Sequence, residues 1–320
     1  MSLWERLQSV LVAASAVAGT LAGLALPIGE AAGHVVLPAL LLMLTGVFVQ
    51  VDATSLGEAR RAHTVVAASL VLNFVWTPLL AWALGTVLLG HNPDLRIGLL
   101  LLLVTPCTDW YLVFTGLARG HMGVAAALLP INLVLQLMLL PLYVMLLGGP
   151  VTSIALGTIV QAVLLVLLVP LAAAVLLRSA SSRWAGAGLR ERVLDPVASA
   201  SAVPLLLVAV FAMFAWQART VVEHALAVVT LLGPLAVFFV VMPAVSTATG
   251  RALRLPRSQR VTLTMSTVAR NSPIALALAV AAFPGRPLIA VSLAVAPLIE
   301  LPVLALISQL VRGRSDAPAG

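Results

Sequence analysis

The sequence predicts an all-α polytopic membrane protein, and three observations support that prediction. Hydrophobic residues make up 62% of the 320 residues, charged residues make up 9%, and the mean hydropathy is +1.13. A soluble chain of this length could not bury so much apolar surface. The apolar residues gather in ten runs, most of them near the length of about 20 residues that crosses a bilayer. No segment is long and polar enough for a soluble domain, so residues 1–320 are expected to form one transmembrane domain.

Ten transmembrane helices are expected, with short links between them. The first is interpreted as a retained helix and not as a secretory signal, because its charged lead is weak and nothing downstream resembles a secreted domain. The second and the seventh are short or polar at one end. The expected helices cover residues 10–26, 35–51, 64–89, 97–117, 124–147, 154–177, 197–216, 225–247, 261–283 and 288–310.

The arginine residues predict the orientation of these helices. All 18 basic residues are arginine. If both termini are cytoplasmic, the cytoplasmic segments hold 14 of them, Arg270 lies within a helix, and the external loops hold only Arg96, Arg219 and Arg286. This asymmetry obeys the positive-inside rule and predicts a multi-pass protein of the cell (plasma) membrane with both ends in the cytoplasm. The basic composition therefore reflects topology and requires no nucleic-acid partner.

The chain divides into two halves of five helices at the link Gly148-Gly149-Pro150, with one repeat at about 8–148 and a second at about 151–311. Because five is odd, the second half enters the membrane in the opposite orientation, and the repeats are inverted. An internal echo at an offset of 167 residues supports the division. It relates Thr105-Pro106 to Ser272-Pro273, Arg119 to Arg286 and Pro130 to Pro297. Folds built this way place a binding site near the midplane, where broken helices meet.

Two polar segments interrupt apolar runs at corresponding places. Thr105-Pro106-Cys107-Thr108-Asp109 lies in the fourth expected helix, and Ala269-Arg270-Asn271-Ser272-Pro273 lies in the ninth. Proline lacks an amide hydrogen and clashes with the carbonyl four residues earlier. We therefore expect broken crossing helices at Pro106 and Pro273, with half-helix ends that can hold an ion or a polar solute. The alternative is that each proline only kinks a packed helix.

Three motifs together resemble one known family. Pro106-Cys107-Thr108 lies in the fourth expected helix, Arg270-Asn271 precedes Ile274-Ala275-Leu276-Ala277 in the ninth, and the tenth contains Ala296-Pro297-Leu298-Ile299-Glu300-Leu301-Pro302-Val303. The last of these is similar to the proline-leucine-isoleucine-glutamate-valine-proline stretch of the arsenite efflux permeases in the bile acid/sodium symporter superfamily. The other two resemble that family's cysteine motif and its helix crossover. The resemblance covers the ten-helix layout, and it implies that Cys107 and Glu300 are needed for arsenite transport.

Physical chemistry is consistent with both roles. Trivalent arsenic and antimony are soft and favour sulfur, so the thiol of Cys107 can contact the metalloid, and a single thiol binds weakly enough to release it. Glu300 is a carboxylate in an apolar helix, where low-dielectric surroundings bring protonation within reach, as a proton antiporter requires. The alternatives are that Cys107 is a small buried hydrophobe and that Glu300 makes a structural hydrogen bond to a neighbouring helix.

Further polar residues are candidates for substrate contact. Asn132 and Gln136 lie four residues apart on one face of the fifth expected helix, where they either line the cavity or join helices through hydrogen bonds. Asn271 belongs to the crossover motif. Asp109 and Arg270 depart from the permease pattern, which has small or apolar residues and asparagine at these two places. They can form an ion pair with each other, or Arg270 can receive an anionic substrate.

These features predict a secondary transporter in the lipid bilayer and not an enzyme, because lipid offers no partners for such polar groups unless protein or a cavity satisfies them. The leading hypothesis is efflux of arsenite or antimonite by proton antiport, with Cys107 at the metalloid and Glu300 carrying the proton. The alternative is a sodium- or proton-coupled carrier of an organic or oxyanionic solute that uses Arg270, although a fixed positive charge there argues against sodium. No metal-binding histidine pair, nucleophile elbow or phosphate loop indicates an enzyme, and neither a cofactor nor a metal site is expected.

Overall fold

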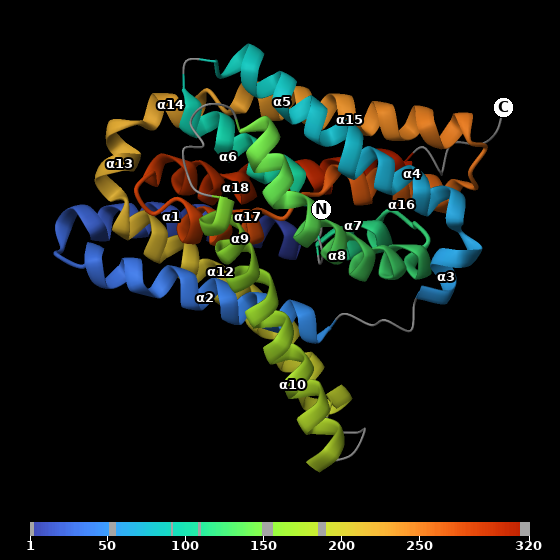
Figure 1. The fold of residues 1–320 in the computed structure, drawn as a ribbon, viewed down its shortest axis with the longest axis horizontal. Coiled ribbons are helices and arrows are strands. Elements are labelled where there is room, and N and C mark those ends of the chain that lie inside the picture. Colours follow the sequence, from blue (N-terminus) through green and yellow to red (C-terminus); the bar gives the residue numbers. More distant parts are fainter. Residues whose placement is uncertain are drawn as a thin grey trace.

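The structure, a computed structural model, describes residues 3–50, 56–90, 92–107, 110–148, 156–184 and 190–313. Within these ranges every regular element is a helix, and one isolated antiparallel bridge joins Pro106 to Arg270. The predicted all-α class is therefore confirmed, and the helices pack into one bundle (Figure 1).

The helices of the first half are α1 (Leu3–Ala25), α2 (Gly29–Val49), α3 (Leu56–Arg61), α4 (His63–Val71), the π-helix η2 (Leu72–Trp76), α5 (Thr77–Leu88), α6 (Pro93–Val104), α7 (Trp110–Leu117) and α8 (Met122–Leu147). Those of the second half are α9 (Leu156–Val163), the π-helix η3 (Leu164–Leu168), α10 (Val169–Trp184), the π-helix η4 (Arg190–Leu194), α12 (Asp195–Trp216), α13 (Ala218–Glu223), α14 (Ala225–Val229), α15 (Leu232–Ala252), α16 (Arg257–Val268), α17 (Ser272–Ala282) and α18 (Pro287–Gly313).

Six helices in the described residues are long and apolar enough to cross a membrane, and a seventh is added when the bent helix α8 counts as one span. The six are Gly29–Val49, His63–Leu88, Val160–Ser181, Arg192–Trp216, Leu232–Ala252 and Pro287–Val311. Two other apolar helices, Val10–Ala25 and Ser272–Ala282, are shorter. The structure thus agrees with a polytopic membrane protein. The count of ten spans stays a prediction, because the apolar helix of the first expected span is shorter than a membrane span and the fourth and ninth expected spans are divided into shorter helices.

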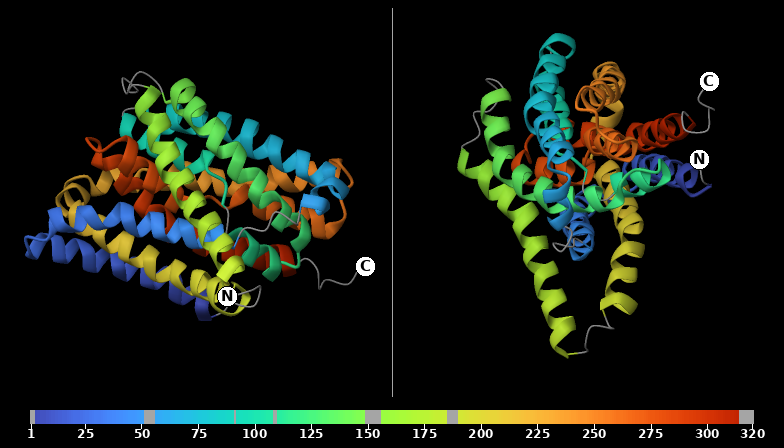
Figure 2. Two further views of the ribbon diagram at one scale, coloured as in Figure 1. Left: turned by 60° about the horizontal axis from the view of Figure 1, so that its bottom comes forward. Right: turned by 90° about the vertical axis from the view of Figure 1, so that its right-hand side faces the viewer.

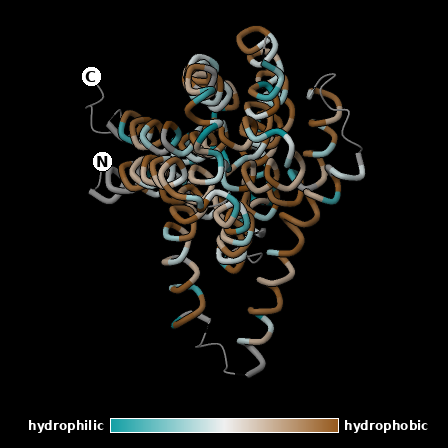
Figure 3. Tube along the Cα trace, turned by 90° about the vertical axis from the view of Figure 1, so that its left-hand side faces the viewer, coloured by the Kyte–Doolittle hydropathy of each residue, from teal (hydrophilic) through white to brown (hydrophobic). Residues whose placement is uncertain are grey.

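The outer surface of the bundle is apolar. Val87, Leu176 and Val240 are 79%, 67% and 72% exposed. Hydrophobic residues run along the outer helices in Figure 3, and α10, which carries Leu176, extends away from the rest of the bundle (Figures 1 and 2). Large apolar patches of this kind are unfavourable in water. They are expected of helices that face the hydrocarbon core of a bilayer.

The eighth expected helix begins later than the sequence predicts. The expectation was one helix over residues 225–247, whereas the structure has the short α14 followed by α15, which runs from Leu232 to Ala252. Pro234 explains the difference, because it has no amide hydrogen and clashes with the carbonyl of Thr230. A proline is tolerated in the first turn of a helix, so α15 begins just before Pro234.

Two glycines allow α1 and α12 to pack closely. A Cβ atom added to Gly19 would lie 2.4 Å from the carbonyl oxygen of Phe211, and one added to Gly23 would lie 2.1 Å from the carbonyl oxygen of Ala215. Such distances are too short for any side chain. The Gly19–Gly23 spacing is that of the small-residue pairs that let membrane helices approach each other.

Helix α8 bends by 52° between Gln136 and Met138. The cause is Pro141, because its ring clashes with the carbonyl of Leu137, four residues earlier. The two segments of α8 therefore point in different directions, and the face that carries Gln136 lies at the bend.

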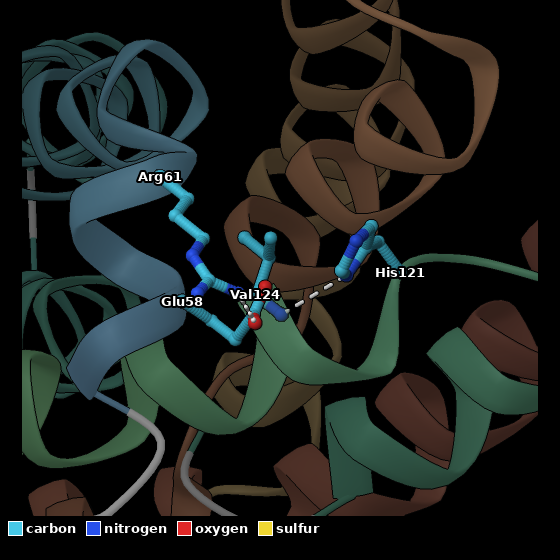
Figure 4. Close-up of polar contacts among 4 residues, drawn as sticks. All are labelled: Glu58, Arg61, His121 and Val124. Carbon is cyan, nitrogen blue, oxygen red and sulfur yellow. Dashed lines mark hydrogen bonds and ion pairs between the residues drawn. The ribbon is translucent and has the colours of Figure 1, made fainter.

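The start of α8 is fastened to its neighbours. The imidazole Nδ1 of His121 accepts a hydrogen bond from the backbone amide of Val124 at 3.2 Å and caps the helix (Figure 4). Glu58 and Arg61 of α3 form an ion pair at 3.3 Å beside this cap (Figure 4). The backbone amide of His121 also donates to Oγ1 of Thr262 on α16 at 2.8 Å. The link from α7 to α8 is therefore attached to the second half of the chain.

Candidate functional site

The two proline-containing breaks lie against each other. α6 and α16 each end where the sequence predicts a break, and the residues that follow them run antiparallel. The backbone amide of Cys107 donates to the carbonyl oxygen of Ala269 at 3.1 Å, and the amide of Asn271 donates to the carbonyl oxygen of Thr105 at 2.8 Å. Each break thus supplies hydrogen-bond partners to the other, as buried backbone in a membrane requires.

The carbonyl groups at the end of α6 also have partners. Oγ1 of Thr105 donates to the carbonyl oxygens of Leu101 and Leu102 at 2.9 and 3.0 Å. The next carbonyl oxygen, that of Leu103, accepts a hydrogen bond from Nη1 of Arg270 at 2.7 Å. A side chain from the second break therefore closes the helix that ends at the first.

Both prolines lie at helix boundaries, so neither kinks a continuous helix. Pro106 takes part in the bridge itself. Pro273 lies in the first turn of α17, where its missing amide costs nothing. Oδ1 of Asn271 accepts a hydrogen bond from the backbone amide of Ile274 at 3.1 Å and caps α17. The side chain of Asn271 thus has a structural role in this conformation.

The guanidinium group of Arg270 is buried among oxygen atoms from several helices. Besides its bond to Leu103, it donates through Nη2 to Oδ1 of Asn73 at 2.7 Å and to the carbonyl oxygen of Thr267. Its central carbon lies 5.4 Å from the ring centre of Phe238, within the range of a cation–π interaction. Only 1% of Arg270 is exposed. The charge is therefore held by carbonyl and amide oxygens and by an aromatic face.

The charge of Arg270 suggests two roles, an ion pair with Asp109 and a contact with an anionic substrate. Asp109 lies outside the described residues, so its ion pair with Arg270 stays a prediction. Both Nη atoms already donate to protein oxygens, which leaves Nε as the nitrogen without a partner in the described residues. A forked contact with an anion would require these bonds to break.

Sequence reasoning missed Asn73, which lies in η2. Its Nδ2 donates to Oγ of Ser69 at 3.3 Å and to the carbonyl oxygen of Ser266 at 3.1 Å, and the two serine hydroxyls lie 3.0 Å apart. These bonds orient Oδ1 of Asn73 toward Arg270. The sequence did carry a signal: Ser69 and Asn73 are polar residues four apart inside an apolar run, and polar groups within a membrane helix often mark functional sites. The structure adds that Asn73 lies in a π-helix, a kind of segment that is frequent at functional sites.

Glu300 on α18 reaches the second break. Its Oε1 accepts a hydrogen bond from the backbone amide of Arg270 at 2.7 Å, and its Oε2 accepts a longer one from Oγ of Ser272 at 3.5 Å. The residue is 4% exposed. The carboxylate lies at the start of α17, where unpaired amides and the positive end of the helix dipole favour a negative charge.

Cys107 is buried in the first break, 2% exposed, and is bound to the second break through its backbone amide. Glu300 contacts the same segment through Arg270 and Ser272. The structure therefore brings together residues from the fourth, ninth and tenth expected helices, as the three motifs predict. Thr108 and Asp109, the residues next along the chain, lie outside the described residues.

Asn132 and Gln136 on α8 are fully buried, and the nitrogen and oxygen atoms of both side chains lack hydrogen-bond partners in the described residues. Within that part of the chain neither residue joins α8 to another helix through a side-chain hydrogen bond. A buried amide without partners is costly, and each such group requires an explanation. A polar ligand or a water molecule that reached this face of α8 would satisfy both.

The groups at and near the crossing suit reversible contact with a small polar solute. They include one thiol, one carboxylate, one guanidinium group and several amides. Among the described residues, no three histidine, cysteine, aspartate or glutamate side chains gather as the ligands of a metal ion do.

Comparison with known proteins identifies the family of this chain. Residues 37–224, more than half of the chain, match the model of the sodium bile acid symporter family. The arsenical-resistance protein Acr3 of Corynebacterium glutamicum is 29% identical over 253 residues, which cover 75% of this chain and 68% of that protein. The family resemblance that the motifs indicate is thereby confirmed. The chain is a multi-pass transporter of a small molecule or ion rather than an enzyme, and it belongs to the sodium bile acid symporter family.

Proposed function

We propose that this transporter expels arsenite, and also antimonite, in exchange for protons. Cys107 contacts the metalloid, and Glu300 carries the proton. The observation that supports this most directly is that both residues contact one short segment, residues 269–272: Cys107 through the carbonyl of Ala269, and Glu300 through Arg270 and Ser272. The similarity to an arsenical-resistance protein supports the choice of substrate.

The substrate chemistry fits the thiol at the crossing and two buried amides of α8. Arsenite in neutral water is the uncharged trihydroxide As(OH)₃, so it offers a soft arsenic centre and three hydroxyl groups. The thiol of Cys107 suits the arsenic. The partnerless amides of Asn132 and Gln136 suit the hydroxyls, because they are buried and have no other partner among the described residues. Because only one thiol is present, the bond to arsenic is weak enough to reverse, as transport requires.

Glu300 is suited to proton exchange by its surroundings. It is buried on α18 and bound to the break by hydrogen bonds that its charged form accepts. Water enters such a site when the helix groups move against each other. The carboxyl group then takes up a proton from one side of the membrane and releases it to the other. Arsenite leaves the cell as the proton enters.

The geometry of the breaks supports two inverted repeats, and we propose ten spans with both termini in the cytoplasm and the protein in the cell membrane. α6 and α16 are both 12 residues long, and their first residues, Pro93 and Arg257, are 164 positions apart. The bridged residues, Pro106 and Arg270, are separated by the same 164 positions. Repeats related by a two-fold axis would pair at equivalent residues. This register differs by three residues from the offset of 167 that relates the prolines and an arginine in the sequence.

The alternative function, a carrier of an organic or oxyanionic solute, receives less support. It uses Arg270 as the anion partner, but that guanidinium group is buried and donates to three protein oxygens. The alternative predicts a saturable anion flux that collapses in Arg270→Gln. It becomes the leading proposal if arsenite transport fails.

The proposed function is tested by arsenite accumulation in an arsenic-sensitive bacterial host. Cells expressing the native chain, Cys107→Ala or Glu300→Gln are compared. Glu223→Gln serves as a control, because Glu223 is exposed and lies on α13, outside the helices that form the crossing. We expect lower arsenite in cells with the native chain and with the control, and no lowering with the other two variants. Equal arsenite with and without the native chain, despite confirmed membrane insertion, would refute the proposal. Efflux that persists in Cys107→Ala would refute the thiol role alone.

A further inference from the structure

The transport proposal leaves one buried group without a role, the guanidinium group of Arg270. Placing a charge in the interior of a membrane protein is costly unless other groups compensate it. Here the compensation is specific. It comes from the carbonyl oxygens of Leu103 and Thr267, from Oδ1 of Asn73, from the ring of Phe238 and from the negative charge of the nearby Glu300 carboxylate.

The two backbone oxygens belong to the ends of half-helices. Leu103 lies in the last turn of α6, and Thr267 lies in the last turn of α16. Carbonyls in the last turn of a helix lack partners within that helix and carry the negative end of its dipole. Both half-helices thus direct their negative ends at the same positive group. Asn73 is held in place for its contact by Ser69 and Ser266.

Transporters with broken helices use these kinds of group, unwound carbonyls and the carboxyl ends of half-helices, to hold coupling sodium ions. We propose that the guanidinium group of Arg270 is a built-in cation that fills a sodium-type position at the crossed breaks, so that this protein neither binds nor needs sodium there. The inference deepens the proposed coupling at this site and rests on the transport proposal for its consequence. The cation position itself is testable without any substrate.

A cation that is part of the chain cannot leave, so it contributes a constant charge throughout the transport cycle. The exchangeable cation at the crossing is then the proton on Glu300, whose carboxylate accepts a hydrogen bond from the backbone amide of the same arginine. Arg270 thereby selects for proton coupling over sodium coupling. Removing its side chain leaves the oxygen atoms of Leu103, Thr267 and Asn73 directed at an empty position that a sodium ion can enter.

The test measures thermal unfolding of the purified full-length chain in NaCl and in choline chloride at equal ionic strength. The variants are Arg270→Ala, Arg270→Asn and Arg270→Lys. Arg257→Ala is a matched control, because Arg257 also donates to a backbone carbonyl, that of Val311 at 3.3 Å, but is exposed. We expect the Tm of the native chain, the lysine variant and the control to be the same in both salts. The alanine and asparagine variants should melt lower in choline chloride and gain about 2–4 °C in NaCl, as a bound ion stabilises the folded state.

Several outcomes would overturn the inference. One is a sodium-specific rise in the Tm of the native chain, and another is an identical Tm of Arg270→Ala in the two salts. If the alanine and asparagine variants fold only when sodium is present, that outcome supports the inference, because sodium then replaces the guanidinium group. If neither folds in either salt, sodium does not replace the guanidinium group and the inference fails. Absence of arsenite efflux would refute the transport proposal but would leave these melting temperatures unchanged.

Discussion

The carboxylate of Glu300 accepts a hydrogen bond from the backbone amide of Arg270 at 2.7 Å. This contact ties α18 to the point where the two broken helices meet. A charged carboxylate is a stronger acceptor than a neutral carboxyl group. We therefore expect protonation of Glu300 to weaken the link between α18 and the crossing, which connects proton uptake to movement of the helices.

Glu300→Gln should abolish transport driven by a pH difference while leaving the fold intact. Glutamine has the same shape and can still accept the hydrogen bond from Arg270, but it cannot exchange a proton. Glu300→Asp keeps the proton and shortens the side chain, so it should retain part of the activity. The measurement is arsenite uptake into everted membrane vesicles with an imposed pH difference. Uptake by Glu300→Gln that still responds to that difference would remove Glu300 from the coupling mechanism.

Arsenite should protect Cys107 from thiol reagents. Cys107 is the only cysteine in the chain, so labelling by a membrane-permeant maleimide reports on this residue alone. It is buried at the crossing, so labelling should be slow and should depend on opening of the site. Trivalent arsenic favours sulfur, so the proposed contact with Cys107 should make arsenite slow labelling further, whereas phosphate should not. Equal protection by both would indicate a general change of conformation instead of contact at sulfur.

Asn132→Leu should reduce transport without reducing stability. The amide of Asn132 is buried without partners among the described residues, and removing an unsatisfied polar group recovers a desolvation cost of about 1–3 kcal/mol. The free energy of unfolding should therefore stay the same or rise. The loss of arsenite efflux would then reflect a lost contact with substrate. A clear fall in stability would show that the amide has a structural partner.

Asn73→Leu should have the opposite effect on stability. Asn73 accepts a hydrogen bond from the charged guanidinium group and donates two others. Hydrogen bonds to charged groups contribute about 1.5–3 kcal/mol each, so the variant should unfold at a clearly lower temperature. Ser69→Ala, which removes a partner of Asn73 but not its contact with Arg270, should lower the Tm less. Thermal unfolding in detergent checks both, and equal effects would contradict the central role given to the Arg270 contact.

Gly23→Val should separate α1 from α12. A Cβ atom at this position would lie 2.1 Å from the carbonyl oxygen of Ala215, so the backbones must move apart, at a cost of about 1–3 kcal/mol or more. Gly233→Ala is the control, because nothing lies within 4 Å of a Cβ atom there, and it should be neutral or slightly stabilising. Thermal unfolding compares the two. A Gly23→Val variant as stable as the native chain would show that α1 and α12 do not pack closely in the membrane.

The sequence was sufficient wherever a local property decides the structure. Continuous apolar runs of about 20 residues predict helices in lipid, because a helix satisfies its backbone polar groups within one segment. Proline chemistry alone predicts the helix breaks at Pro106 and Pro273, and both occur. The apolar pattern predicts helix boundaries less well. It predicts a helix from residue 225, whereas α15 begins at Leu232, because Pro234 can be accommodated only in the first turn of a helix.

The contacts at the crossing were decided only by the tertiary structure. Arg270 meets Asn73 across 197 positions of the sequence, and Glu300 meets the amide of Arg270 across 30. No local pattern in the chain specifies which carbonyls a guanidinium group will reach. That depends on the register and angle at which the helices pack. Residue types therefore determined that this is a membrane protein with two polar breaks. Helix packing determined that Arg270 of the second break donates a hydrogen bond to the carbonyl oxygen of Leu103, at the end of the helix before the first break.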